Sequence, residues 1–544
     1  MSDFVLHAFL IPSHSDKPGS IIPMQTHYQF TSSAQPDGST LVWLEEYDRQ
    51  EKDVGGASLL PIDSVTVIYG INGGGKTQLL LDICNTLGHP DRKRPVGVLW
   101  EEHGQLYFDP GNCGLQVAFQ GGRTVQTASL MAGQAVFGSI FYTTSPFEGA
   151  RRRRWLSDSD TIDATPAFSA NNPFGGVSLL RASGALPREL PFIRDAEIEL
   201  SVHIPRFGEL IEHYTGYRSR GGAPAEPRYV AVTAEQLDRL KTLPRNLDRR
   251  LLKSLIIEME HARRQGEQVA KHLFLQILHA PDRSNVNSYI FELLLSRGGS
   301  HGTAGALDMV EALEVLQRRG GTAANGTRTF LGYVQDAQNW SEPTFHALQQ
   351  AEALGVLSWS FQNLSSGQIA MLMLFASLAN AIEKLAGRSG RCLVLTVDEG
   401  EMFMHPAWQR SYLSHLLSFL AFYRRRFDAI HLMLTTHSLI VAGDAPPKRL
   451  YDVVSGKMEN GFAARPEELL DSIYNVKNFS GEYVDQLYAR IGNYLREGGT
   501  SNEALDVRAL VSQIASDRLR HYLEDEVNRR IGSMHAQAQN TPRR

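Results

Sequence analysis

The stretch GINGGGKT, residues 70–77, decides the fold expected of this chain. It follows the β-branched, apolar run VTVIY at 65–69 and precedes the leucines at 79–81. The spacing fits G-x-x-x-x-G-K-[ST], a glycine-rich loop that joins a strand to a helix and turns its backbone amides toward phosphate oxygens. The alternative is a glycine-rich turn that ends in Lys-Thr by chance. The strand before the loop and the apolar helix after it favour the phosphate loop.

The side chains and the glycines of this loop are expected to contribute to nucleotide binding in different ways. Lys76 can reach the β- and γ-phosphates of a nucleotide, and Thr77 can offer a hydroxyl to Mg²⁺. The positive end of the following helix points at the same place. Glycine allows backbone conformations that are closed to residues with a Cβ. The loop residues expected to bind the nucleotide are Gly70, Asn72, Gly73, Gly74, Gly75, Lys76 and Thr77.

The composition is that of an ordinary globular protein, with 544 residues of which 42% are hydrophobic and 21% charged. A net charge of -5 gives no global attraction to nucleic acid, so such binding would need local patches. The three cysteines form no C-x-x-C pair, which favours a reducing compartment over a zinc site or disulfide framework. The apolar run at 369–382 is short for a membrane span and predicts a buried helix. We therefore expect a cytoplasmic protein without a membrane partner.

Two further apolar runs end in residues that suit phosphate hydrolysis. Asp398 and Glu399 follow the run CLVLTV at 392–397, and His437 follows LMLTT at 432–436. Asp398 is expected to hold Mg²⁺, directly or through water. Glu399 can orient or deprotonate the attacking water, and His437 can contact the γ-phosphate and the same water. The alternative is structural, because a D-E pair often marks only a strand end and a lone histidine is usually structural.

Four motifs in this order resemble the ATPase head of ABC-type proteins: GINGGGKT, LSSGQ at 364–368, LVLTVDE at 393–399 and LTTHS at 434–438. The loop variant G-x-N-G-x-G-K-[ST] is similar to the SMC and RecF branch and to the related overcoming-lysogenization-defect (OLD) group. DEGEMFMHPAWQ at 398–409 resembles D-E-x-E-x-x-x-H-P-x-x-Q, a pattern of the OLD group.

The resemblance implies an α/β fold in which a phosphate-loop ATPase head is assembled from two separated parts. The first part, 1–145, is expected to contain an N-terminal antiparallel β subdomain, and the second part is expected at 355–445. The segment 146–354 between them is expected to be a mainly helical insertion. The segment 446–544 is expected to be a helical extension with a disordered tail.

The resemblance also implies a sandwich of two ATP molecules between two heads, in a homodimer or higher homo-oligomer. In ABC heads the signature loop of one subunit contacts the γ-phosphate of the ATP held by the other. Carried over, this assigns Ser365, Ser366, Gly367 and Gln368 to the nucleotide of a second head. A glutamine at a strand end commonly joins the Mg²⁺ shell in this family. Gln120 is the candidate here, and Ser145 in FYTTSPF is its rival.

Several biological roles fit these motifs. Similar stand-alone ATPases occur in Septu-type and retron-associated anti-phage systems, where they act with a separate effector such as a nuclease or toxin. A DNA-repair or chromosome-maintenance ATPase is one alternative, and a nucleotide-sensing scaffold that hardly hydrolyses ATP is another. The arginine runs at 151–154 and 424–426 either bind a DNA backbone or are solvated charge. No nuclease cluster stands out in 446–544, so we expect an ATPase whose nucleotide state controls an effector protein or DNA.

Overall fold

The computed structural model describes most of the chain. It covers residues 4–12, 19–24, 28–34, 40–46, 60–71, 73–88, 94–119, 123–130, 137–145, 149–156, 159–165, 180–181, 190–216, 229–281, 285–297, 305–317, 322–324, 327–386, 391–472 and 482–539. The fold class is α/β, as expected. The chain forms two compact units, Met1–Ala464 and Arg465–Arg544, and each is described by itself.

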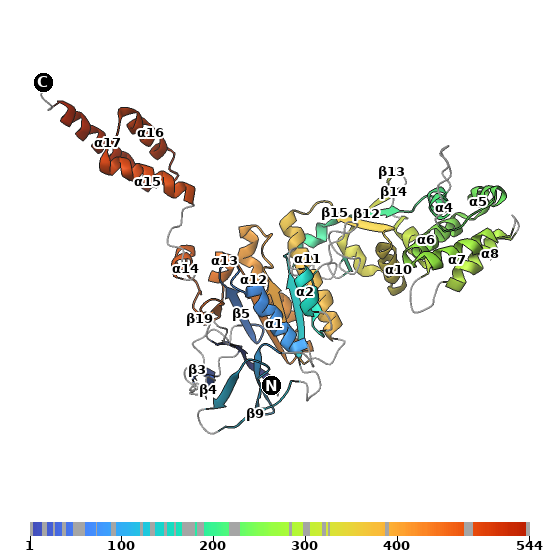
Figure 1. Ribbon diagram of the computed structural model, residues 1–544, viewed down its shortest axis with the longest axis horizontal. Helices are drawn as coiled ribbons and strands as arrows, with labels where there is room; N and C mark the ends of the chain where they lie inside the picture. Colours follow the sequence, from blue (N-terminus) through green and yellow to red (C-terminus); the bar gives the residue numbers. More distant parts are fainter. Residues whose placement is uncertain are drawn as a thin grey trace. The chain divides into compact units, whose positions relative to one another are not determined.

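A seven-stranded sheet forms the centre of the first unit (Figure 1). Its strands in spatial order are β11 (Ile162–Asp163), β10 (Phe137–Thr143), β16 (Cys392–Asp398), β17 (Ala429–Thr435), β5 (Ser64–Tyr69), β18 (Leu450–Asp452) and β19 (Lys457–Glu459). Every neighbouring pair is parallel except β18 and β19. Strands β5, β16 and β17 are buried along their whole length, which explains their unbroken apolar sequences, because a parallel sheet is covered on both faces.

Helices pack on both faces of this sheet. Helix α1 (Lys76–Gly88) shares a buried cluster with Phe141 of β10. Alternate residues of a strand point to opposite faces, so Gly138 of β10 lies on the other face, beside α11 (Ser366–Ala386). A Cβ on Gly138 would come within 2.5 Å of Leu385 Cδ2, so the glycine allows α11 to approach. The neighbouring helical segments are α2 (Gly149–Leu156), α12 (Pro406–Phe422), η5 (Arg424–Arg426) and α13 (Leu439–Gly443).

Helix α11 contains the apolar run at 369–382 and is buried, as predicted. Among the described residues it is the one helix long and apolar enough to cross a membrane, and 67% of its apolar window is buried inside the protein. Helix α11 packs against α12 through Phe375 and Phe419, whose rings meet edge to face with centroids 5.2 Å apart.

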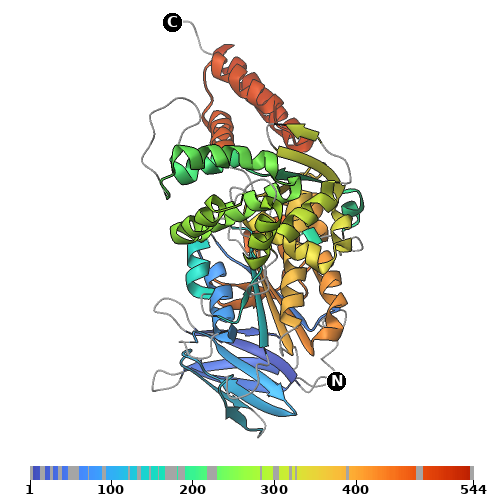
Figure 2. The same ribbon diagram turned by 90° about the vertical axis from the view of Figure 1, so that its right-hand side faces the viewer.

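The N-terminal strands form two further sheets (Figure 2). The first has the order β2 (Ser20–Pro23), β1 (Phe4–Ile11), β6 (Gly97–Glu102), β7 (Gln105–Asp109) and β9 (Val125–Thr127). The second has the order β3 (Tyr28–Ala34), β4 (Thr40–Glu46) and β8 (Leu115–Phe119). The expectation of one antiparallel sheet needs correction, since β7 pairs with β9 and β4 with β8 in parallel. Apolar burial explains the difference: Val42, Leu44 and Leu115 share a core with residues of the first sheet.

A second group of helices lies between α2 and α11 in the sequence. They are α4 (Phe207–Thr215), α5 (Ala234–Asn246), α6 (Arg249–Gln265), α7 (Glu267–Leu278), α8 (Val286–Arg297), α9 (Ala306–Gln317) and α10 (Glu342–Ala353), with 3-10 segments η3 (Pro191–Asp195) and η4 (Val334–Asn339). The insertion is therefore rich in helix, as the sequence predicts.

The same region also contains an antiparallel sheet that the sequence reading missed. Its order is β13 (Thr322–Ala324), β14 (Thr327–Tyr333), β12 (Glu197–His203) and β15 (Leu357–Phe361). Strand β13 and the first two residues of β14 lie within the glycine-rich stretch 318–328, and the sequence between the two strands, Asn325-Gly326, is common in hairpin turns. Strand β15, in the segment assigned to the second part of the head, pairs with β12.

The predicted helical extension from 446 begins instead with two strands. Strand β18 lies beside β5 because Leu450 and Tyr451 are buried there, and β19 pairs with β18. The second unit contains α14 (Pro466–Ser472), α15 (Glu482–Glu497), α16 (Ser501–Ser512) and α17 (Asp517–Gln539). The last three share a small apolar core that includes Ile491, Val511 and Val527. The end of the predicted disordered tail, 540–544, lies outside the described residues.

Candidate active site

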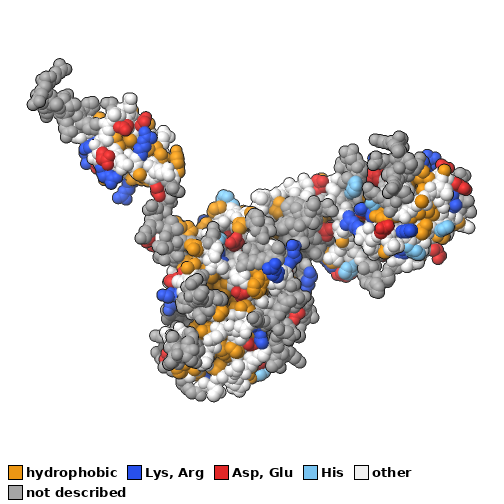
Figure 3. All heavy atoms as spheres, in the orientation of Figure 1, with side chains coloured by type: hydrophobic (Ala, Val, Ile, Leu, Met, Phe, Trp, Pro, Cys, Tyr) orange, Lys and Arg blue, Asp and Glu red, His pale blue; other side chains and the backbone are white. Residues whose placement is uncertain are grey.

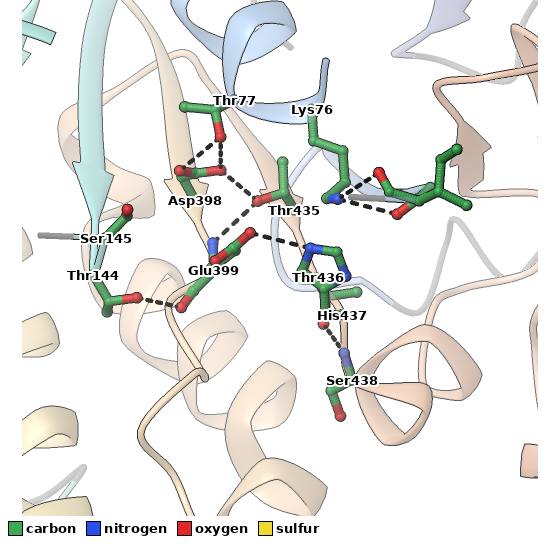
Figure 4. A network of polar contacts seen from close by, with 12 residues as sticks. Lys76, Thr77, Thr144, Ser145, Asp398, Glu399, Thr435, Thr436, His437 and Ser438 are labelled. Carbon is green, nitrogen blue, oxygen red and sulfur yellow. Dashed lines mark hydrogen bonds and ion pairs between the residues drawn. The ribbon is translucent and has the colours of Figure 1, made fainter. Parts of the chain in front are cut away.

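The glycine-rich loop begins where β5 ends and leads into α1. Gly70, Gly73 and Gly75 have φ angles of 148°, 77° and 100°, a region of backbone conformation that favours glycine. Lys76 is 6% exposed and folds back over the loop, where Nζ donates to Gly70 O at 3.0 Å and to Ile71 O at 3.4 Å (Figure 4). The lysine ammonium therefore lies inside the curve of the loop.

Asp398 ends β16 and accepts hydrogen bonds from three threonines, two of which, Thr77 and Thr435, are drawn in Figure 4. Thr77 Oγ1 lies 3.0 and 3.1 Å from its two carboxylate oxygens. Thr143 Oγ1 donates to Oδ2 at 3.0 Å, and Thr435 Oγ1 donates to Oδ1 at 2.7 Å. Thr143, Asp398 and Thr435 are register partners on the adjacent strands β10, β16 and β17, which places their side chains side by side.

Glu399 follows in a left-handed backbone conformation, with φ of 52°. Its backbone is held on both sides: its amide donates to Thr435 Oγ1 at 3.0 Å, and its carbonyl accepts from Thr144 Oγ1 at 2.6 Å. Its carboxylate Oε1 lies 3.2 Å from His437 Nε2. The left-handed turn costs on the order of 1–3 kcal/mol in a residue with a Cβ, and such strain concentrates at functional sites.

Burial disfavours the charged forms of Lys76 and Asp398 in this cluster. Burial lowers the pKa of Lys76, while the carboxylates of Glu399, Asp398 and Glu401 act in the opposite direction. Burial raises the pKa of Asp398. The hydrogen bond from His437 holds the pKa of Glu399 below its usual range, so Glu399 stays a carboxylate near neutral pH. A ligand with phosphate oxygens and a divalent cation would match both Lys76 and Asp398.

The signature segment lies beside a different hollow. Ser365 and Gln368 form a reciprocal cap at the start of α11, in which the Ser365 amide donates to Gln368 Oε1 at 2.9 Å. A hollow of about 360 Å³ is lined by Ser365, Ser366, Gly367, Met402, Phe403, Met404, His405 and Trp408. Gln368 therefore caps its own helix, and the Lys76 loop contributes no wall to this hollow.

The structure brings together five residues that the sequence singles out: Lys76, Thr77, Asp398, Glu399 and His437. Two other candidates, Asn72 and Gln120, lie outside the described residues. Of the remaining loop glycines, Gly74 donates its amide to Ile71 O at 3.0 Å. Ser145, the rival of Gln120, follows Thr144 at the end of β10, and its amide donates to Thr143 Oγ1 at 3.0 Å.

Sequence reasoning missed the hydroxyl groups that hold the two carboxylates. Thr143, Thr144 and Thr435 make direct contacts with Asp398 or the backbone of Glu399. Their signal was the Thr-Thr pair at the end of each apolar run, in FYTTS and LTTHS. A buried glutamate, Glu401, was also passed over, although it is part of the quoted pattern D-E-x-E.

Both arginine runs contribute contacts within the fold, since Arg152 Nε of α2 donates to Asp163 Oδ2 at 2.6 Å. Arg424 is used within the fold, since its guanidinium donates to Asp63 at 3.1 Å and to the carbonyls of Phe427 and Asp428. Arg426 forms an ion pair with Glu383. Lysine and arginine side chains gather on the surface over α2, which carries the run at 151–154 (Figure 3).

The donor chemistry of the cluster suits a small, hard cation. A hydroxyl from Thr77 and a carboxylate from Asp398 are the oxygen ligands that Mg²⁺ accepts alongside water and phosphate. Within the described ranges, no group of three or more His, Cys, Asp or Glu residues could hold a metal ion by itself. A scan against protein-family models finds no match for this chain, and a search of the curated proteins finds none.

Proposed function

We propose that this chain is an ATPase with an ABC-type head. The observation that carries the proposal is the meeting of three segments that are far apart in the sequence. The loop after β5, the end of β16 and the end of β17 place Lys76, Thr77, Asp398, Glu399 and His437 in one polar cluster (Figure 4). A glycine-rich turn that ended in Lys-Thr by chance would have no reason to face a buried carboxylate.

The loop and α1 would bind the phosphates of ATP. Lys76 would exchange its contacts with Gly70 O and Ile71 O for phosphate oxygens, since a charge-assisted contact is stronger than one to a neutral carbonyl. The loop amides and the positive end of α1 would act in the same direction. Thr77 and Asp398 would hold Mg²⁺, which supplies positive charge to the triphosphate.

Glu399 would act as the general base. Water would form a bond to the γ-phosphorus while the bond from that phosphorus to the bridging oxygen of ADP breaks, and the water proton would pass to Glu399. The carboxylate is ready for this role because the hydrogen bond to His437 keeps it charged. His437, whose side chain is 38% exposed, would donate to a γ-phosphate oxygen as negative charge develops.

We also propose that two heads face each other across two ATP molecules. The hydroxyl of Ser366 and the start of α11 offer donors to an anion, and the Ser365 hydroxyl would exchange its bond to Gln368 Oε1, at 2.9 Å, for the anion. Because they line a hollow separate from the Lys76 loop, they would serve the ATP of a second copy. Closure of the pair would control a separate effector protein, or DNA, by binding it differently in the two states. The arginines of α2 are the candidate contacts to DNA.

Release of phosphate from ATP tests the proposal. The purified chain should release phosphate with Mg²⁺, and chelation of the metal should stop the reaction. Lys76→Ala should lose about 1.5–3 kcal/mol of ATP binding, or 10- to 100-fold in affinity, because a charged contact to phosphate is removed. Lys457→Ala is the matched control, since this lysine is exposed on β19. An inactive wild-type chain, or full activity in Lys76→Ala, would overturn the assignment.

A further inference from the structure

The turn that carries His437 is anchored on its first side by Glu401. Thr436, which precedes His437, is buried and donates its hydroxyl to Glu401 Oε1. Glu401 is only 3% exposed. A carboxyl group buried so deeply is costly unless it is hydrogen-bonded, and the bond to Oε1 comes from Thr436 of the histidine turn, whereas Oε2 has no hydrogen-bond partner in the described site.

The same turn is anchored on its second side by Gln409. Ser438, which follows His437, donates its hydroxyl to Gln409 Oε1 at 2.7 Å. Gln409 Nε2 in turn donates to Met404 O at 3.0 Å. The Ser438 amide donates to Thr436 Oγ1 at 2.9 Å, which closes the turn on itself. His437 therefore stands between two residues that are each tied to the segment 401–409.

These contacts explain the rest of the pattern that follows Asp398 and Glu399. Glu401 lies in the turn after β16, and Gln409 lies in the first turns of α12. His405 caps α12, because its Nδ1 accepts from the Ala407 amide at 3.2 Å. The helix start is thereby fixed, and with it the position from which Gln409 reaches the histidine turn.

We propose that Glu401 and Gln409 are positioning residues for hydrolysis, which together hold the Thr436–Ser438 turn so that His437 meets Glu399. This inference rests on the proposed ATPase function for its kinetic consequence. Its structural basis is independent of that function. In the described site the only contact that orients the His437 ring is the one to Glu399, at 3.2 Å, so the position of the turn determines whether the two side chains meet. A displacement of about 1 Å in such a group can lower a rate on the order of 10²-fold.

A double-mutant cycle provides the kinetic test. Glu401→Ala should lower kcat by about 10- to 100-fold while ATP affinity, measured by calorimetry, changes less than about threefold, because the Lys76 loop is untouched. Glu401→Gln, which keeps an acceptor for Thr436, should recover part of the rate. In a His437→Ala background, Glu401→Ala should have almost no further effect, because the two residues act as one unit. Independent, multiplicative effects would overturn the proposal.

A second measurement does not depend on catalysis. In protein labelled with ¹⁵N-histidine, the His437 ring signal can be assigned by its loss in His437→Ala. Glu401→Ala and Gln409→Ala should both shift or broaden this signal, whereas Arg410→Ala, on the exposed neighbour of Gln409, should not. If Glu401→Ala fails to fold, the effect of Gln409→Ala on the His437 signal provides the test by itself. An unchanged His437 signal in a folded variant would overturn the positioning role even if the wild-type chain hydrolyses no ATP.

Discussion

At the scale of single residues, hydroxyl groups determine how the two carboxylates of the site are presented. Thr435 Oγ1 donates to Asp398 and accepts from the Glu399 amide, so one side chain orders both residues. A carboxylate held by hydroxyl donors stays buried without a full ion pair. The Thr-Thr pairs were readable in the sequence, but their partners were not, because each bond crosses between strands that are distant in the chain.

A buried histidine in the same sheet gives a pH-dependent prediction. His431 lies on β17 with Nδ1 2.7 Å from Ser64 Oγ, and burial lowers its pKa to about 3, helped by nearby Arg449, Arg424 and His7. Between about pH 6.5 and pH 3 the unfolded chain binds a proton that the folded chain refuses. Stability is therefore lost as the pH falls through this window.

The size of this loss is about 1.4 kcal/mol per pH unit below pH 6.5, or about 2 kcal/mol between pH 7.5 and pH 5. His431→Asn can keep a hydrogen bond to Ser64 but cannot bind the proton. Its free energy of unfolding, measured in urea, should therefore fall by about 2 kcal/mol less than that of the wild type between pH 7.5 and pH 5. His103→Asn, at an exposed histidine in the turn after β6, should keep the wild-type dependence. Equal pH dependence in the wild type and His431→Asn would contradict the account.

At the scale of elements, the sequence predicted the parts whose signal is local. The buried runs that became β5, β16 and β17 were recognisable because strands covered on both faces are apolar throughout. Gly266, whose φ is 128°, separates α6 from α7. Pro244 lies inside the last turn of α5.

Pairing between strands was harder to predict than the strands themselves. Strands β3 and β4 are neighbours in the chain, yet β8, the parallel partner of β4, comes about 70 residues later and is chosen by shared apolar burial. Strand β15 looked like part of the head because it lies just before the signature segment, but it completes the sheet of the insertion. Long-range contacts of this kind leave no pattern in a single stretch of sequence.

A glycine between sheet and helix gives a prediction at this scale. Gly138→Ala should destabilise the first unit by about 1–3 kcal/mol, because the added Cβ would lie 2.5 Å from Leu385 of α11. In a Leu385→Ala background the same substitution should cost almost nothing, although Leu385→Ala is itself destabilising. Gly332→Ala on β14, where the nearest atom would be 3.9 Å away, is the control. Urea unfolding gives the free energy of unfolding of all four variants. An equal loss of stability from Gly138→Ala with and without Leu385→Ala would contradict the packing argument.

At the scale of the molecule, the candidate site is assembled from the two ends of the first unit. Lys76 and Thr77 come before the helical insertion, and Asp398, Glu399 and His437 come after it. The central sheet makes this possible, since β5 pairs with β17 and β17 with β16 across the whole insertion. The motifs predicted this meeting, whereas the function of the insertion and of the C-terminal helices leaves no comparable signature in the sequence.

The proposed sandwich of heads gives a prediction about assembly. With ATP and Mg²⁺, Glu399→Gln should double its molar mass in light scattering, because bound ATP that is not hydrolysed keeps two heads together. Gly367→Asp in the same background should prevent this, since a carboxylate at the start of α11 would repel the phosphate. Without nucleotide both variants should remain the size of the wild-type chain. A Glu399→Gln variant that binds ATP and stays monomeric would contradict the sandwich.

The most direct test of the account is the rate of phosphate release at saturating ATP by the wild type and by Glu399→Gln. We expect Glu399→Gln to bind ATP with an affinity within a few fold of the wild type and to release phosphate about 10²- to 10⁴-fold more slowly, because the general base is lost. Glu459→Gln, at an exposed glutamate on β19, should behave as the wild type. An unchanged rate in Glu399→Gln, or no phosphate release by the wild type, would contradict the claim that this cluster hydrolyses ATP.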